Sequence, residues 1–258
     1  MKTSAFRDAL PAIGVFVAVL VIWEIGFLVL GVQSFLIPRP TVIAASLAEQ
    51  WATLVRGVLF TGTEAVLGLL VGLVLGTAAG FATARWVSAR EVLLPVAIGA
   101  STIPIIAFAP ITLNWFGPES LLPRITIVAV MVFFPVMVNT VRGLTNVDPA
   151  ALELLSSYAA GDGQTLLKLR GPNALPYWFT ALRIATTLAV IGAVVGEFFG
   201  GPLYALGLYI TNMTGSSRYP AAWAAIVLAC TLGIVLYLVA VALERIVMPW
   251  NAEREAAR

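Results

Sequence analysis

The sequence predicts an all-α membrane protein with six transmembrane helices in a single domain, residues 1–258. Composition is the first reason: 60% of the residues are apolar and 11% are charged, with a mean hydropathy of +0.97. So few polar residues do not cover the surface of a soluble domain. The apolar runs are also continuous rather than alternating, which disfavours a β-barrel. At about 20 residues per crossing, the chain has room for five or six helices and their loops.

Six apolar runs mark the expected spans. The first lacks a cleavage site of small residues, so we expect it to be retained as a helix. After it, Pro38-Arg39-Pro40 predicts an extended turn, and residues 41–55 predict a short interfacial helix with Trp51 at the lipid headgroups. Residues 251–258 predict a solvated tail. The expected spans are residues 12–31, 61–84, 93–113, 125–141, 177–199 and 221–243.

Basic residues predict the orientation, because they concentrate on the cytoplasmic side of a membrane protein. With both termini in the cytoplasm, most of the Lys and Arg residues lie on the cytoplasmic side. Arg183 lies within the fifth span, nearer to the cytoplasmic than to the outer side. The cytoplasmic set is Lys2, Arg7, Arg85, Arg90, Arg142, Lys168, Arg170, Arg245, Arg254 and Arg258. The outer set is Arg39, Arg56, Arg124 and Arg218. The long polar segment 144–173 then also faces the cytoplasm.

The second span carries glycines at every fourth position. At 3.6 residues per turn they form one smooth stripe along the helix, on which another backbone can approach closely. We expect this stripe to pack against another helix of the same chain, and a subunit interface is the alternative. The four residues are Gly68, Gly72, Gly76 and Gly80.

The third span is interrupted by Pro95, Pro104 and Pro110. Proline removes an amide donor and clashes with the preceding turn, so this helix is expected to be kinked or unwound. Transporters place broken helices beside their pathway. Pro104, Pro110 and, in the fourth span, Asn139 are therefore candidate pathway residues, with a simple packing kink as the alternative.

Carboxylates lie in or at the rim of three apolar runs, at Glu24, Glu64 and Glu197. All three fall in the outer half of their helices in the predicted orientation. Arg183 is fourteen residues from Glu197, ~21 Å along one helix, so these two do not pair. Glu24 and Glu197 are candidates for the outer end of a pathway, and solvation at the interface is the alternative.

Residues 148–161 predict a short cytoplasmic helix of about twelve residues, ~18 Å long. Asp148 is a good N-cap, Pro149 suits the first turn and Gly161 is a good terminator. Its apolar residues Leu152, Leu155 and Ala159 form a narrow stripe, leaving Glu153 and Ser157 on other faces. Such a stripe is typical of docking into a groove on a partner. A helix lying on the membrane surface is the alternative, but the absence of Lys and Arg disfavours it.

This segment resembles the EAA loop of binding-protein-dependent ABC importer permeases. In that family Glu-Ala-Ala precedes a glycine six residues later and then a Leu-Pro pair. Glu153 and Leu175-Pro176 match that pattern. Leu154 and Leu155 replace the two alanines, and Ala159 stands at the glycine position.

Other short strings resemble the nitrate, sulfonate and taurine branch of these permeases. They are Pro-Arg-Pro at 38–40, Pro-Ile-Ile-Ala-Phe-Ala-Pro at 104–110, Trp-Phe-Gly at 115–117, Phe-Phe-Pro at 133–135 and Ala-Leu-Arg-Ile-Ala at 181–185. Residues 196–201 and 221–226 are more similar to permeases for riboflavin or thiamine-pyrimidine precursors.

The resemblance implies a type I importer fold in the bacterial inner membrane, with the segment at about 148–172 coupling ATPase closure to the spans. Its coupling residues here are Asp148, Glu153, Leu154, Leu155, Ser157, Ala159 and Gly161. It implies a second permease subunit, most simply a second copy of this chain, two cytoplasmic ATPase subunits that bind ATP and Mg, and an extracytoplasmic binding protein. The cargo implied is a small polar or anionic solute, either riboflavin or a thiamine-pyrimidine precursor, or else a sulfonate or nitrate.

We expect no catalysis within the chain itself. It has no histidine, and its lysines, Lys2 and Lys168, are not in a Gly-x-x-x-x-Gly-Lys phosphate loop. The single cysteine, Cys230, excludes an intrachain disulfide. No metal site and no nucleic-acid partner are expected. The alternatives are an ion-coupled secondary transporter, a membrane enzyme and a purely structural membrane subunit.

Overall fold

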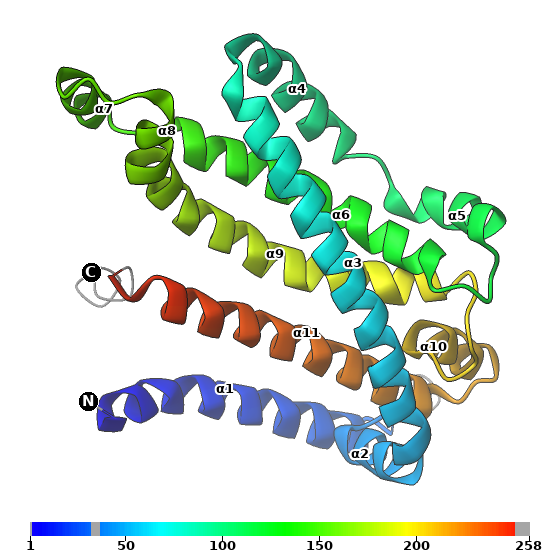
Figure 1. Ribbon diagram of the computed structural model, residues 1–258. Helices are drawn as coiled ribbons and strands as arrows, with labels where there is room; N and C mark the ends of the chain where they lie inside the picture. The colour runs from blue at the N-terminus through cyan, green and yellow to red at the C-terminus, as the bar shows by residue number, and fades with distance from the viewer. Residues whose placement is uncertain (1, 32–36, 251–258) are drawn as a thin grey trace.

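The computed structural model describes residues 2–31 and 37–250, which form helices joined by short loops (Figure 1). No strand occurs within these residues, so the all-α class is confirmed. The predicted tail at 251–258 lies outside the described residues.

Three long helices form the centre of the bundle: α3 (Trp51–Arg85), α6 (Leu122–Thr145) and α9 (Gly171–Glu197). Their shared core is built mainly from small and β-branched side chains, so the helices approach closely. Ala65, Val128, Val132, Ala185 and Ala189 are fully buried there. The helix α11 (Tyr219–Val247) packs on α9, while α1 (Lys2–Val29) contacts the short helix α2 (Pro40–Glu49).

The glycine stripe of α3 lies against α6. A Cβ added at Gly72 would lie 2.7 Å from the Cβ of Val132 and 2.8 Å from the carbonyl oxygen of Ala129. A Cβ added at Gly80 would lie 2.6 Å from the Cβ of Thr140. Carbon atoms in contact normally keep about 3.5–4.0 Å, so a side chain at these positions would push the two helices apart. The stripe therefore packs within this chain.

The expected count of six spans is confirmed only in part. Four described helices are long and apolar enough to cross a membrane: α3, α6, α11 and the continuous helix Asp162–Glu197. A bent pair of helices makes up to five if it counts as one span. The first expected span corresponds to Ile13–Val29 in α1, a shorter apolar helix than the about 20 residues of an ordinary crossing.

The third expected span is broken, as its prolines predicted. It consists of α4 (Val87–Ala100), a 3₁₀ turn η1 (Ile105–Phe108) and α5 (Ala109–Phe116), with an 83° bend between the two parts. The break falls just before Pro104, whereas Pro95 lies inside α4 and Pro110 in the first turn of α5. A proline in a first turn leaves no hydrogen bond unmade, so Pro110 starts a helix instead of breaking one.

The fifth expected span begins earlier than residue 177. The short helix α8 (Asp162–Thr165) and a π-turn η2 (Leu166–Arg170) lead directly into α9, giving one helix of 36 residues. In the π-turn, the Gly171 amide donates to the carbonyl of Leu166, five residues back. This wider turn precedes Pro172, which has no amide to donate, so the helix continues where polar residues and proline predicted a loop.

Candidate functional site

The short helix α7 (Pro149–Ser157) lies at one corner of the molecule (Figure 1). Asp148 caps its start, because its side chain accepts a hydrogen bond of 3.0 Å from the Ala150 amide. No residue of α7 is buried. The helix therefore presents most of its surface to solvent or to a partner.

The exposed apolar face of α7 is not the predicted stripe. Leu154 is 58% exposed and Tyr158, just after the helix, is 76% exposed. Leu152 and Leu155 are half-buried on the side toward the rest of the chain. Residues four positions apart lie on one helical face, so Leu154 and Tyr158 form a surface with the exposed Glu153 and Ser157 beside it.

The end of α7 also differs from the prediction. The helix has nine residues rather than about twelve, and Ala159 adopts a left-handed backbone with φ of 53°. That conformation reverses the chain and ends the helix, as glycine does at many C-termini. Gly161 does not terminate α7, because it is the residue before α8. Ala159, the residue with the left-handed backbone, thus stands at the position where the EAA loop of the importer permeases has glycine.

Three polar side chains tie the base of this segment to α6 and α9. The Asn173 amide donates to the carbonyl oxygens of Gly143 at 2.8 Å and Asn146 at 3.0 Å. The Asn146 amide donates to the Tyr177 hydroxyl at 2.9 Å. Because Gly143 lies near the end of α6, these bonds join the two central helices where the chain leaves for α7. Neither asparagine was singled out from the sequence.

A buried polar cluster, consisting of Thr61, Glu64, Arg124 and Glu197, lies at the other end of the bundle. Arg124 and Glu64 form an ion pair with side chains 1% and 0% exposed. The remaining Arg124 nitrogens donate to the carbonyls of Gly200 at 3.1 Å and Ser120 at 2.8 Å, with a longer bond of 3.3 Å to Pro118. The cluster thus fastens the loops before α6 and after α9 to α3.

Glu197 belongs to this cluster and is fully buried. Its carboxylate accepts 2.6 Å hydrogen bonds from the Thr61 hydroxyl and from the Gly207 amide. Gly207 lies in the first turn of α10 (Leu206–Gly215), where backbone amides have no partner within the helix. The carboxylate therefore caps this helix and interacts favourably with its dipole. Close by, the Tyr209 hydroxyl donates to Gln50, and burial raises the pKa of Tyr209 above its usual value.

The other predicted pathway residues make local contacts. Glu24 accepts hydrogen bonds from the Thr41 amide at 3.0 Å and hydroxyl at 2.8 Å, so it caps the start of α2. The Asn139 amide donates to the carbonyl of Pro135 on its own helix at 2.8 Å. The structure therefore does not bring Glu24, Asn139 and Glu197 together at one site.

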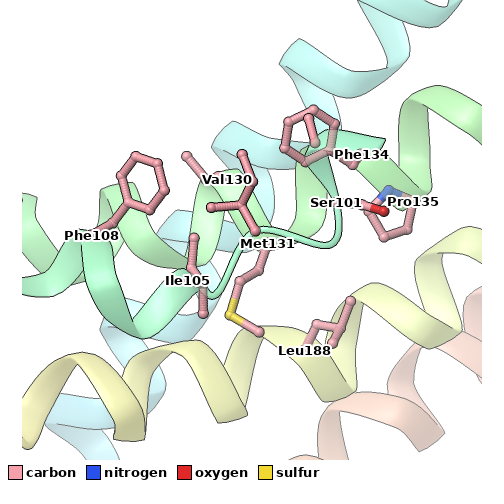
Figure 2. A pocket seen from close by; sticks show the side chains of 10 residues that line it. Ser101, Ile105, Phe108, Val130, Met131, Phe134, Pro135 and Leu188 are labelled. Carbon is pink, nitrogen blue, oxygen red and sulfur yellow. The ribbon is translucent and has the colours of Figure 1, made fainter. Parts of the chain in front are cut away.

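A cavity of about 350 Å³ lies where the broken helix meets the middle of α6 and α9. Its wall includes Ile105 and Phe108 from η1, Met131 and Phe134 from α6, and Leu188 from α9 (Figure 2). This volume is within the roughly 300–1,000 Å³ range of small-molecule sites.

Sequence reasoning missed two ion pairs that lie at least partly buried between helices. Arg124 and Glu64 are 60 positions apart, and Arg183 contacts Glu244 of α11 at 3.4 Å. The available signal was that all four charges lie inside or beside apolar runs, where an ionised side chain needs a partner. Which charges form a pair depends on how the helices pack together, and the residue pattern of a single segment gives no information about that packing.

These features together define a class. Transporters place broken helices beside a cavity near mid-membrane, and α4–α5 has that arrangement among spans long enough to cross a bilayer. Within the described residues, no group of three potential metal-ligating side chains occurs. The fold and site are those of a multi-pass membrane transport protein.

Comparison with known proteins gives the particular family. Residues 65–249 match the family described as binding-protein-dependent transport system inner membrane component, and the chain belongs to it. The chain is 33% identical over 244 residues to the formylaminopyrimidine transport permease protein ThiX of Halalkalibacterium halodurans, covering 93% of this chain and 95% of the relative. It is 31% identical over 259 residues to the riboflavin transport system permease protein RibX of Chloroflexus aurantiacus, covering 94% and 91%.

A more distant relative is the aliphatic sulfonates transport permease protein SsuC of Bacillus subtilis, 26% identical over 251 residues with 95% and 87% covered. The predicted type I ABC importer fold and the permease function are thereby confirmed. The chain is a transmembrane permease subunit of an ABC importer.

Proposed function

We propose that the chain passes a neutral or weakly polar heteroaromatic solute across the bacterial inner membrane, driven by a separate ATPase that docks on α7. Two copies of the chain would form the pathway, with two cytoplasmic ATPase subunits binding ATP and Mg and an extracytoplasmic protein delivering the solute. The observation that most supports docking is the exposed surface formed by Leu154 of α7, 58% exposed, and Tyr158 just after it, 76% exposed, at the edge of the fold.

The arrangement of helix ends supports cytoplasmic termini. The start of α1, the end of α11 and α7 lie on one side of the molecule (Figure 1). The basic residues Arg85, Arg142 and Arg245 lie in the last turns of α3, α6 and α11. A concentration of Arg at these helix ends favours the cytoplasmic side for α7, where ATP is available.

The contacts at the base of α7 support its role in coupling. An ATPase that prefers different positions of α7 with and without nucleotide would shift the population of two helix packings. Asn173 and Asn146 connect the segment to both α6 and α9, which border the cavity. Movement of α7 would therefore reach the pathway through these two helices.

The relatives support the solute class. The two described above that exceed 30% identity carry names for transport of formylaminopyrimidine and riboflavin, both of which contain nitrogen heterocycles. The relative named for sulfonates is more distant, at 26%. We therefore place heteroaromatic solutes ahead of sulfonates or nitrate.

Charge reversal on α7 tests the docking proposal. Glu153→Lys should reduce co-purification of the ATPase and ATP-driven uptake in vesicles, while membrane insertion stays intact. Glu49→Lys is the matched control, since Glu49 is an exposed carboxylate on α2, away from α7. Unchanged co-purification and uptake in Glu153→Lys would contradict docking at α7. Uptake driven by an ion gradient without any ATPase would favour the secondary-transporter alternative.

A further inference from the structure

The cavity beside the broken helix has a wall without charge. Most of its side chains are apolar, and Ser101 is the polar side chain among its lining residues within the described chain. The wall includes Ser101, Ile103, Phe108, Met131, Phe134 and Leu188. An anion such as a sulfonate would lose its hydration here without meeting a cation, at a cost of several kcal/mol.

The break in the helix supplies the missing polar groups. Among the described residues, no hydrogen bond reaches the carbonyl oxygens of Ser101 and Ile103. The Ser101 hydroxyl donates to the carbonyl of Ile98 at 2.6 Å, so its oxygen still has a lone pair to accept with. Both residues are exposed, so these carbonyl oxygens are free to accept a hydrogen bond from a ligand. The cavity therefore offers acceptors to a ligand that carries N–H groups.

Aromatic and thioether side chains occupy the rest of the wall. Phe134 and Met131 extend from neighbouring positions on α6, and Phe108 extends from η1 (Figure 2). Flat aromatic faces and polarisable sulfur both favour a planar π-system. The cavity also lies halfway along α6 and α9, the depth at which transporters bind their solutes.

From these observations we infer that the cavity between the α4–η1 break, α6 and α9 is a transient solute site that recognises a neutral, planar nitrogen heterocycle bearing N–H donors. The ring contacts Phe134, Met131 and Phe108, and its N–H groups donate to the carbonyls of Ser101 and Ile103. The inference rests on the proposed function, since it assigns the step within the membrane that follows delivery by the binding protein.

Uptake by the assembled transporter tests the site. The permease, its ATPase and its binding protein are reconstituted in vesicles, and ATP-driven uptake of riboflavin and of formylaminopyrimidine is measured beside taurine and nitrate. Phe134→Leu keeps an apolar side chain but removes the aromatic face. KM for uptake of the two heterocycles should then rise about tenfold, equivalent to ~1.4 kcal/mol. Leu188→Trp fills the cavity and should abolish ring uptake. Phe81→Leu, at a 44% exposed position on α3, is the matched control and should behave as the unsubstituted protein.

The possible outcomes distinguish a failure of the proposed solute site from a failure of the proposed importer function. Assembly of each variant with the ATPase, measured by co-purification, shows that a loss of uptake is not a loss of folding. Wild-type KM in both Phe134→Leu and Leu188→Trp would overturn the site. ATP-driven uptake of taurine or nitrate without uptake of either ring would overturn the heterocycle assignment and leave the importer function intact. Uptake that needs no ATPase would overturn the proposed function itself.

Discussion

The buried polar cluster allows a prediction that separates charge balance from simple loss of contacts. Arg124 contributes one positive charge and pairs with Glu64, and Glu197 adds a second fully buried carboxyl group to the cluster. Replacing Arg124 removes the cation and leaves both carboxyl groups buried. Replacing Glu64 by glutamine removes one of the two like-charged groups and keeps an oxygen to accept the Arg124 N–H. The two substitutions are therefore expected to differ in severity.

The magnitudes follow from the burial of the pair, whose side chains are 1% and 0% exposed. Breaking a buried ion pair by removing one partner costs about 3–5 kcal/mol, and we assign this cost to Arg124→Gln. Glu64→Gln is expected to cost about 1.5 kcal/mol, the low end for a hydrogen bond to a charged group. At roughly 2–4 °C per kcal/mol, Arg124→Gln should lower Tm by about 6–20 °C.

Thermal unfolding of the detergent-solubilised protein, followed by loss of monodisperse material, measures both effects. Arg56→Gln is the matched control, because Arg56 is an exposed arginine on α3, and its Tm should change by less than about 2 °C. If Glu64→Gln lowers Tm as much as Arg124→Gln, the charge-balance reasoning is refuted. If neither lowers it, the cluster does not stabilise the bundle.

Three further predictions concern single positions. Gly72→Leu should lower the yield of folded protein, because its Cβ would lie 2.7 Å from Val132, and a normal yield would contradict the packing of α3 on α6. Ala159→Gly should stabilise the turn after α7 by about 0.5–1 kcal/mol, since glycine adopts the left-handed backbone without strain, and slower amide exchange there would measure this. Glu197→Ala should impair assembly as well as uptake, because it leaves the Gly207 amide without its acceptor. Normal assembly with lost uptake would instead favour a direct role of this carboxylate in the pathway.

Local sequence signals predicted much of the fold. The caps and breaks came from residues that act on their own backbone: Asp148 at the start of α7 and Pro104 at the break before η1. The glycine stripe was also readable, since its four-residue spacing survives in any straight helix. The start of α9 was not predicted, because the π-turn before Pro172 lets a helix continue through residues that usually end one.

Contacts between distant segments were not predictable in the same way. The exposed face of α7 depends on which side of that helix the rest of the chain covers, so Leu154 and Tyr158 were not distinguished from Leu152 and Leu155. Glu197 was singled out as a candidate for the outer end of a pathway, whereas the structure shows it fully buried in the polar cluster. The amide that donates to it belongs to Gly207, ten positions later on α10. That helix can pack against α9 only because Gly207 has no side chain.

If an ATPase docks on α7 as proposed, the way in which α9 is held at its two ends determines how movement reaches the cavity. At one end, Glu197 holds α9 to α3 and α10 through buried hydrogen bonds. At the other end, Asn173 joins α9 to α6 through one partly buried and one exposed hydrogen bond, which open at lower cost than fully buried ones. A helix fixed at one end and displaced at the other swings most near its free end, and Leu188 of the cavity lies between the two. From Asn173 to Leu188 the helix rises ~22 Å, so a small tilt at its α7 end is carried to the cavity wall without unfolding α9.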